Sequence, residues 1–122
     1  MAKTVLVVDD STVFRQVVAI ALKRAGYQVL EACDGQDALA KLDGRKINLI
    51  VSDVNMPNMD GISFVKSAKQ LPAYKFTPII MLTTETAEAK KAEGKAVGVR
   101  AWVTKPFQAP VLLDAVSKLL VS

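Results

Sequence analysis

Three aspartates stand where short apolar runs end and a buried strand would give way to a loop. Asp9 and Asp10 follow residues 5–8, and Asp53 follows residues 47–52. Carboxylates held a few ångströms apart repel one another, and a divalent cation relieves that repulsion. Mg²⁺ prefers oxygen ligands and commonly keeps several waters beside one or two carboxylates. The three aspartates therefore predict a magnesium site, provided that the fold brings the two runs together.

Two further runs end in a hydroxyl and a cation. Thr83 and Thr84 follow residues 78–82, and Lys105 follows residues 101–104. Mg²⁺ beside a free carboxylate, a hydroxyl and an ammonium suits phosphoryl transfer, because the cations neutralise the phosphoryl oxygens while the carboxylate attacks. One aspartate at a strand end is usually a turn former or a helix cap. That interpretation does not account for three aspartates together with a lysine.

The residue types that are missing narrow the chemistry. The 122 residues include no histidine and one cysteine, Cys33. Serine–histidine and cysteine–histidine catalysis, imidazole-bound metals and an intramolecular disulfide are therefore excluded. A single cysteine is compatible with a reducing cytoplasm, and we expect Cys33 to serve in packing.

Composition and charge indicate one cytoplasmic domain. Hydrophobic residues make up 51% and charged residues 23% of the chain, as in an ordinary globular domain. No apolar stretch approaches the roughly 20 residues that span a bilayer, and the first residues lack the long apolar region of a secretory signal. The net charge is +4, but basic residues occur at most in pairs. We expect a monomer with no nucleic-acid partner and no membrane partner.

The apolar periodicity alternates between that of strands and that of helices. Strands are expected at residues 4–8, 27–32, 47–52, 78–82 and 101–104. Helices are expected from Thr12 to about Gly26, after Asp34, after Asp60, over 87–97 and after Pro110. Five strand–helix units imply an α/β fold with a parallel sheet covered on both faces. Ligands of such a sheet bind at the carboxyl ends of its strands, where the residues described above stand.

Helical spacing also predicts the buried face of three of these helices. In the first helix the residues at that spacing are Phe14, Val17, Val18, Ala21 and Leu22. In the helix after Asp60 they are Ile62, Val65 and Ala68, and in the last helix they are Leu112, Ala115, Val116, Leu119 and Leu120. We expect these side chains to face the sheet.

Four segments, in order along the chain, resemble the receiver domain of two-component response regulators: VLVVDDS, DVNMPNMDG, MLTTE and WVTKPF. Each segment alone is weakly specific, but their order and spacing together are highly specific. The resemblance covers the whole chain and implies a doubly wound, flavodoxin-like (CheY-like) (βα)5 fold with strand order 2-1-3-4-5. It also implies a single receiver domain over residues 1–122, with no output domain, similar to stand-alone chemotaxis regulators.

The resemblance implies a role for each residue at the strand ends. Asp53 would be the phosphoacceptor. Asp10 and Asp53 would bind Mg²⁺ directly, Asp9 would act through water, and Asn55 would contribute its backbone carbonyl. Lys105 would pair with the phosphoryl group.

A second set of roles concerns switching and signal lifetime. In the family, Thr83 would turn its hydroxyl toward the phosphoryl oxygen and Trp102 would follow it inward as the aromatic switch, although Tyr or Phe is more common there. Pro106 would follow a cis peptide. Asn55 and Glu85 are the pair found in chemotaxis regulators that dephosphorylate themselves quickly, which favours a short-lived signal.

The implied function is signalling rather than enzymatic turnover. The chain would take a phosphoryl group from the phosphohistidine of a partner histidine kinase, which fits its own lack of histidine. It would then bind a protein target, such as the flagellar motor switch in chemotaxis, through its fourth helix, fifth strand and fifth helix.

Three alternatives stay open. The first is an intermediate carrier in a phosphorelay. The second is a magnesium-dependent small-molecule phosphatase, which usually shows D-x-D after the first strand and a cap insertion, whereas Asp9 and Asp10 are adjacent here. The third is a degenerate receiver that acts as a scaffold without phosphorylation, against which the complete set of site residues argues.

Overall fold

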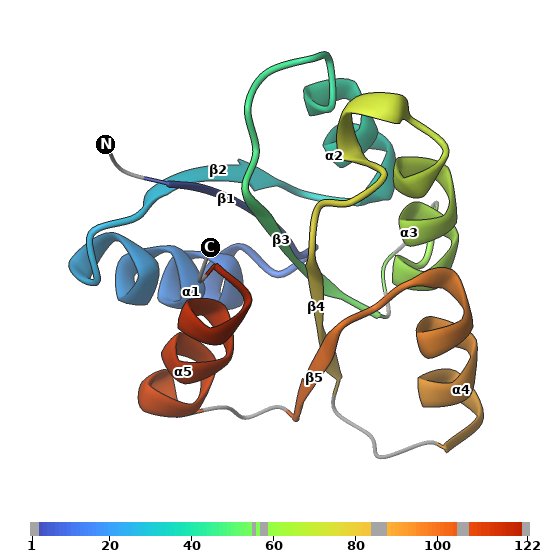
Figure 1. The fold of residues 1–122 in the computed structure, drawn as a ribbon. Coiled ribbons are helices and arrows are strands. Elements are labelled where there is room, and N and C mark those ends of the chain that lie inside the picture. Colours follow the sequence, from blue (N-terminus) through green and yellow to red (C-terminus); the bar gives the residue numbers. More distant parts are fainter. Residues whose placement is uncertain (1–2, 55, 57–58, 84–87, 105–107, 121–122) are drawn as a thin grey trace.

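The computed structural model describes residues 3–54, 56, 59–83, 88–104 and 108–120. Five strands alternate with helices along the chain (Figure 1). The strands are β1 (Thr4–Val8), β2 (Gln28–Ala32), β3 (Leu49–Asp53), β4 (Ile79–Thr83) and β5 (Ala101–Thr104). The helices are α1 (Thr12–Arg24), α2 (Gly35–Lys41), α3 (Gly61–Lys69), α4 (Glu88–Val97) and α5 (Ala109–Leu119), with a short 3₁₀ helix, η1 (Pro72–Tyr74), after α3. No helix within these ranges is long and apolar enough to span a membrane.

The strands form one parallel sheet in the order β2-β1-β3-β4-β5, which confirms the expected order. The register sets Val8 opposite Ser52, Asp53 opposite Leu82 and Thr83 opposite Thr104. The carboxyl ends of β1, β3, β4 and β5 therefore finish close to one level. This shared level is what brings residues distant in sequence to one edge of the sheet.

Helices cover both faces of the sheet (Figure 1): α1 and α5 lie on one face, and α2, α3 and α4 on the other. Strand residues alternate between the two faces, as the pleat requires. Toward α1 and α5 point Val5, Val7, Leu49, Val51, Ile80, Leu82 and Val103. Toward the other helices point Leu6, Val8, Ile50, Ile79 and Met81. Both sets are almost completely buried, which explains why the strands read as continuous apolar runs.

Two predictions about burial are wrong. Val17 was expected to face the sheet, but half of its surface is exposed, because α1 directs Val18 and Leu22 inward and Val17 toward α5. Cys33 was expected in the packing, but it is exposed. It comes directly after the last residue of β2, an edge strand, in the turn before Asp34 caps α2.

Charge is divided between the two edges of the sheet. At the edge where the strands end, which we call the acidic edge, Asp34 and Asp60 cap α2 and α3. Crossovers of a parallel sheet return each helix to the opposite edge, which we call the basic edge. The last turns of the five helices carry only basic residues among their charges: Lys23, Arg24, Lys41, Lys66, Lys69, Lys95 and Lys118. Cations there are stabilised by the partial negative charge of the helix C-termini.

Candidate functional site

The three aspartates at the acidic edge lie together. One carboxylate oxygen from each of Asp9, Asp10 and Asp53 lies within 4.8 Å of the others. The convergence follows from the pairing of β1 with β3, in which Val8 stands opposite Ser52. Asp9 and Asp53 are buried, whereas Asp10 is exposed. The site thus has a buried floor and an open side.

Asp9 is held in place by the start of α1 and the end of β2. Its carboxylate Oδ1 accepts a hydrogen bond of 2.9 Å from the Ser11 N–H, and its own N–H donates to the Ala32 carbonyl at 3.1 Å. Arg15 Nη1 donates to the Asp9 carbonyl at 2.7 Å, and Arg15 Nε pairs with Glu31 at 3.2 Å. These bonds fix the turn from β1 into α1 and therefore the direction of both aspartates that follow β1.

The backbone that carries Asp53 is also tightly fixed. The Val54 N–H donates to the Leu82 carbonyl at 3.1 Å, and the Gly61 N–H donates to the Val54 carbonyl at 2.8 Å. The Ser52 hydroxyl donates to the Asp53 carbonyl at 3.0 Å. The first residue of α3 therefore lies directly against the end of β3. This close approach needs a glycine, because a side chain on Gly61 would strike the β3 backbone.

Thr83 and Trp102 share one face of the sheet. Thr83 is the last residue of β4 and is 5% exposed, at the strand end next to Asp53. Trp102, opposite Met81 on β5, is partly buried against the cluster that covers the α2, α3 and α4 face. Side chains alternate along a strand, so Thr83 points to the same face as Met81. The two predicted switch residues thus lie on the face that α4 covers.

Four predicted residues lie outside the described part of the chain: Asn55, Glu85, Lys105 and Pro106. Their predicted roles stay predictions. Lys105 directly follows Thr104, which ends β5 at the acidic edge opposite Thr83.

The donor set at the acidic edge fits a hard divalent cation. It consists of carboxylate oxygens, with neither sulfur nor imidazole among the grouped ligands. Mg²⁺ takes such ligands and keeps part of its water shell. The site is open to solvent on the side of exposed Asp10, where those waters can lie. The chemistry available is charge neutralisation beside a carboxylate that can act as a nucleophile.

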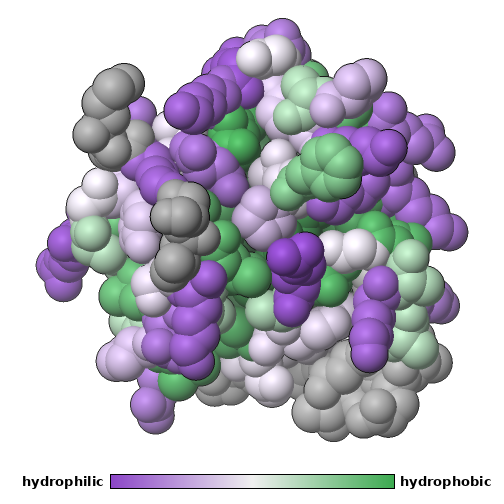
Figure 2. Space-filling view, in the orientation of Figure 1, coloured by the Kyte–Doolittle hydropathy of each residue, from purple (hydrophilic) through white to green (hydrophobic). Residues whose placement is uncertain are grey.

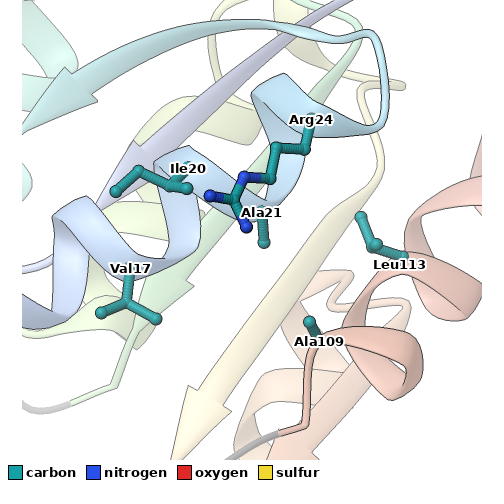
Figure 3. A pocket seen from close by; sticks show the side chains of 6 residues that line it. All are labelled: Val17, Ile20, Ala21, Arg24, Ala109 and Leu113. Carbon is teal, nitrogen blue, oxygen red and sulfur yellow. The ribbon is translucent and has the colours of Figure 1, made fainter.

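An apolar groove that was not predicted from the sequence lies between α1 and α5 (Figure 3). It has a volume of about 360 Å³ and is lined by Val17, Ile20, Ala21 and Arg24 of α1 and by Ala109 and Leu113 of α5. On the face drawn in Figure 2, hydrophobic surface emerges between hydrophilic side chains over the region of α1 and α5. The signal in the sequence was a second apolar stripe on α1, formed by Val13, Val17 and Ile20, all at least half exposed.

Comparison with known proteins gives consistent matches over nearly the whole chain. The family model described as "Response regulator receiver domain" matches residues 5–117. Protein PilG of Pseudomonas aeruginosa is 40% identical over 112 residues, covering 92% of this chain and 83% of that protein. Chemotaxis protein CheY1 of Helicobacter pylori is 38% identical and covers 94% of both chains. The solved structure of chemotaxis protein CheY4 of Vibrio cholerae is 50% identical, with a TM-score of 0.95, covering 98% of this chain and all of that chain.

Proposed function

This chain belongs to the response regulator receiver family, and from that premise we propose that Asp53 accepts a phosphoryl group from a partner histidine kinase. Receiver domains take phosphate from histidine kinases, bind Mg²⁺ at an acidic pocket and act on protein targets. The observation that carries the proposal is the group of Asp9, Asp10 and Asp53, whose ligand oxygens lie within 4.8 Å of one another. Asp10 and Asp53 would then bind Mg²⁺ directly, Asp9 would act through water, and Asp53 would also be the nucleophile.

The transfer exchanges one bond to phosphorus for another. A carboxylate oxygen of Asp53 attacks the phosphorus, the bond from phosphorus to the imidazole nitrogen of the donor breaks, and that nitrogen keeps the electron pair. Mg²⁺, when bound, supplies positive charge to the phosphoryl oxygens. The hydrogen bonds to the Asp53 and Val54 carbonyls keep the nucleophile in position throughout. Lys105 pairs with the phosphoryl group after transfer, as the family resemblance implies.

The donor reaches the site over α1. This helix begins two residues after Asp10, and its exposed side chains Val13, Val17 and Ile20 continue away from the acidic edge toward the groove shown in Figure 3. Exposed apolar stripes at helical spacing mark surfaces that pack against another helix. We assign this stripe to the donor, whose histidine must come within bonding distance of Asp53.

Chemotaxis is the signalling role that we favour, with the flagellar motor switch as the target. Two relatives named above carry chemotaxis in their names, CheY1 and CheY4. The sequence pair Asn55 and Glu85 supports a short-lived phosphoryl group, which suits such a signal better than a phosphorelay carrier. We propose a single receiver domain whose output surface consists of α4, β5 and α5.

The test is phosphorylation with acetyl phosphate and Mg²⁺, followed by mass spectrometry of the intact chain and its peptides. We expect one labile phosphoryl group on Asp53, lost in Asp53→Asn and retained in Asp114→Asn, a matched change at an exposed side chain of α5. An adduct on another residue, or none with Mg²⁺ present, contradicts the proposal. Continuous release of phosphate from small phosphate esters would instead favour the phosphatase alternative.

A further inference from the structure

A second hollow lies at the basic edge, away from the three aspartates. Its volume is about 590 Å³. Segments that are separate in the sequence line it: Lys69 at the end of α3, Lys75 and Phe76 after η1, Lys95 near the end of α4, and Arg100 just before β5. None of these side chains belongs to the phosphoryl-transfer site.

The hollow is strongly positive. Of the lining residues that the structure describes, four are cations and none is a carboxylate. Among the described residues, no ion pair involves any of these four cations, although such pairs occur elsewhere, as between Lys41 and Asp37. Helix ends account for Lys69 and Lys95, but Lys75 and Arg100 lie outside the α-helices.

The surroundings of Lys69 illustrate how little of this positive charge is compensated by negative groups. Its Nζ donates to the Thr77 carbonyl, a neutral acceptor. Burial and the neighbouring Arg100 guanidinium lower the pKa of Lys69 below its usual value. A bound anion would counter both effects, because it supplies negative charge where the described lining residues supply none.

An aromatic ring stands at the rim of this positive hollow. Phe76 is 87% exposed, the highest value among the large hydrophobic residues that the structure describes, and Lys75 Nζ lies 5.6 Å from the ring centroid. Exposed rings of this kind provide a stacking surface for a planar group. The position beside the cations places such a surface within reach of a ligand that also fills the hollow.

We propose that the hollow binds a small phosphate-bearing molecule with a flat ring, in chemical terms a nucleotide. The cations take the phosphates, and Phe76 takes the ring. The volume lies within the range of about 300–1,000 Å³ usual for small-molecule sites. An acidic protein segment is less well matched, because the cations converge on one hollow rather than forming a stripe.

The test is calorimetric titration of the full chain with ATP in EDTA, which removes Mg²⁺ from both ligand and protein. We expect saturable binding that Lys75→Gln and Arg100→Gln each weaken by about two- to fivefold, the effect of losing one exposed ion pair. Matched controls are Lys23→Gln and Lys118→Gln, which remove cations of the basic edge outside the hollow. They should leave the affinity unchanged.

Inorganic triphosphate separates the contribution of the ring. We expect Phe76→Ala to weaken the binding of ATP while leaving the binding of triphosphate unchanged. The absence of saturable ATP binding overturns the proposal, and so does equal weakening by the control variants, which would indicate diffuse attraction to the basic edge. Binding of a glutamate-rich peptide without binding of ATP would assign the hollow to a protein partner instead. Because Asp53→Asn leaves the hollow intact, repeating the titration with that variant keeps this result separate from the phosphorylation proposal.

Discussion

An ideal Cβ atom placed on Gly61 would lie 2.3 Å from the backbone carbonyl oxygen of Asp53. The same atom would lie 2.6 Å from the Met81 methyl carbon. Real Cβ atoms do not come this close to backbone oxygen, so α3 can begin against the end of β3 only because residue 61 has no side chain. The position of the proposed phosphoacceptor therefore depends on a residue that does no chemistry.

We expect Gly61→Ala to lower the free energy of unfolding by about 1–3 kcal/mol, the usual cost of forcing extra volume into a packed interior. It should also weaken Mg²⁺ binding, because the Asp53 backbone must shift. The control is Gly35→Ala, whose Cβ would meet only the flexible side chain of Met59, at 3.0 Å. Denaturant melts and Mg²⁺ titration provide the measurements. Equal stability of the two variants would show that the structure around residue 61 shifts at little cost to accommodate a side chain next to the Asp53 carbonyl.

Asp10→Asn should raise the melting temperature in EDTA, since it removes one of three crowded carboxylates. An increase of up to about 1 kcal/mol in the free energy of unfolding corresponds to a rise of a few degrees in the melting temperature of a domain of this size. The same variant should bind Mg²⁺ more weakly and gain less stability from it. Asp53→Asn should have the same effects, whereas Asp114→Asn, in the middle of α5 and outside the cluster, should not. Lower melting temperatures for both site variants in EDTA would refute repulsion within the cluster.

Asp37 should contribute stability that depends on pH. Hydrogen bonds from Lys41 Nζ and the Cys33 N–H lower the pKa of this carboxyl below its usual value. A lowered pKa in the folded state favours folding above the unfolded pKa of about 4, and the contribution disappears as pH falls through the folded value. Asp37→Asn should therefore cost less than about 1 kcal/mol near neutral pH, given the exposure of the pair. Urea melts should show this difference shrinking on acidification, and a constant difference would exclude the charge as its cause.

Trp102 is the only tryptophan, so its fluorescence reports one position on β5. Beryllofluoride with Mg²⁺, which imitates a phosphoryl group, should change its emission maximum or its quenching by iodide. Thr83→Ala should reduce the change, because Thr83 is buried at the strand end next to Asp53 and points to the same face of the sheet as Trp102. Asp53→Asn should abolish it. If Trp102 fluorescence does not change with beryllofluoride although Asp53 can be phosphorylated, the assignment of Asp53 as phosphoacceptor stands and the aromatic switch is refuted.

The pair Asn55 and Glu85 should set how long the phosphoryl group lasts. An amide and a carboxylate can orient an attacking water, which is the main contribution a protein makes to such hydrolysis. Replacing both with bulky or cationic residues should lengthen the half-life of phosphorylated Asp53, measured by loss of the adduct over time. An unchanged half-life would remove the reason for preferring chemotaxis over a phosphorelay.

The fold and the acidic edge could be predicted because both depend on local pattern. The change between strand and helix periodicity located every strand and α-helix but not η1, and the strand ends indicated Asp9, Asp10 and Asp53. Strand boundaries moved by one or two residues where the flanking residues pair differently, as Asn48 does with Thr4 before β3 begins.

What escaped prediction depends on packing between distant segments. Val17 has the spacing of a core residue, and only the place of α5 decides that it lines a groove. Gly61 has no signal of its own, because its constraint is a carbonyl eight residues earlier. The positive hollow joins α3, α4 and two loops, and nothing in any one of these segments indicates the others.

The division of charge between the two edges also gives the molecule an electric dipole moment along its strands. The carboxylates of Asp9, Asp10, Asp34, Asp53 and Asp60 lie at one pole, and the lysines and arginines of the helix ends lie at the other. In the field of a charged partner, such a body experiences a torque before contact, within a Debye length of about 8–10 Å. A phosphoryl group on Asp53 would add negative charge at the pole that is already negative. The phosphorylated molecule would then approach a cationic target in a more strongly preferred orientation. Phosphorylation would therefore also increase the rate of productive association with the target.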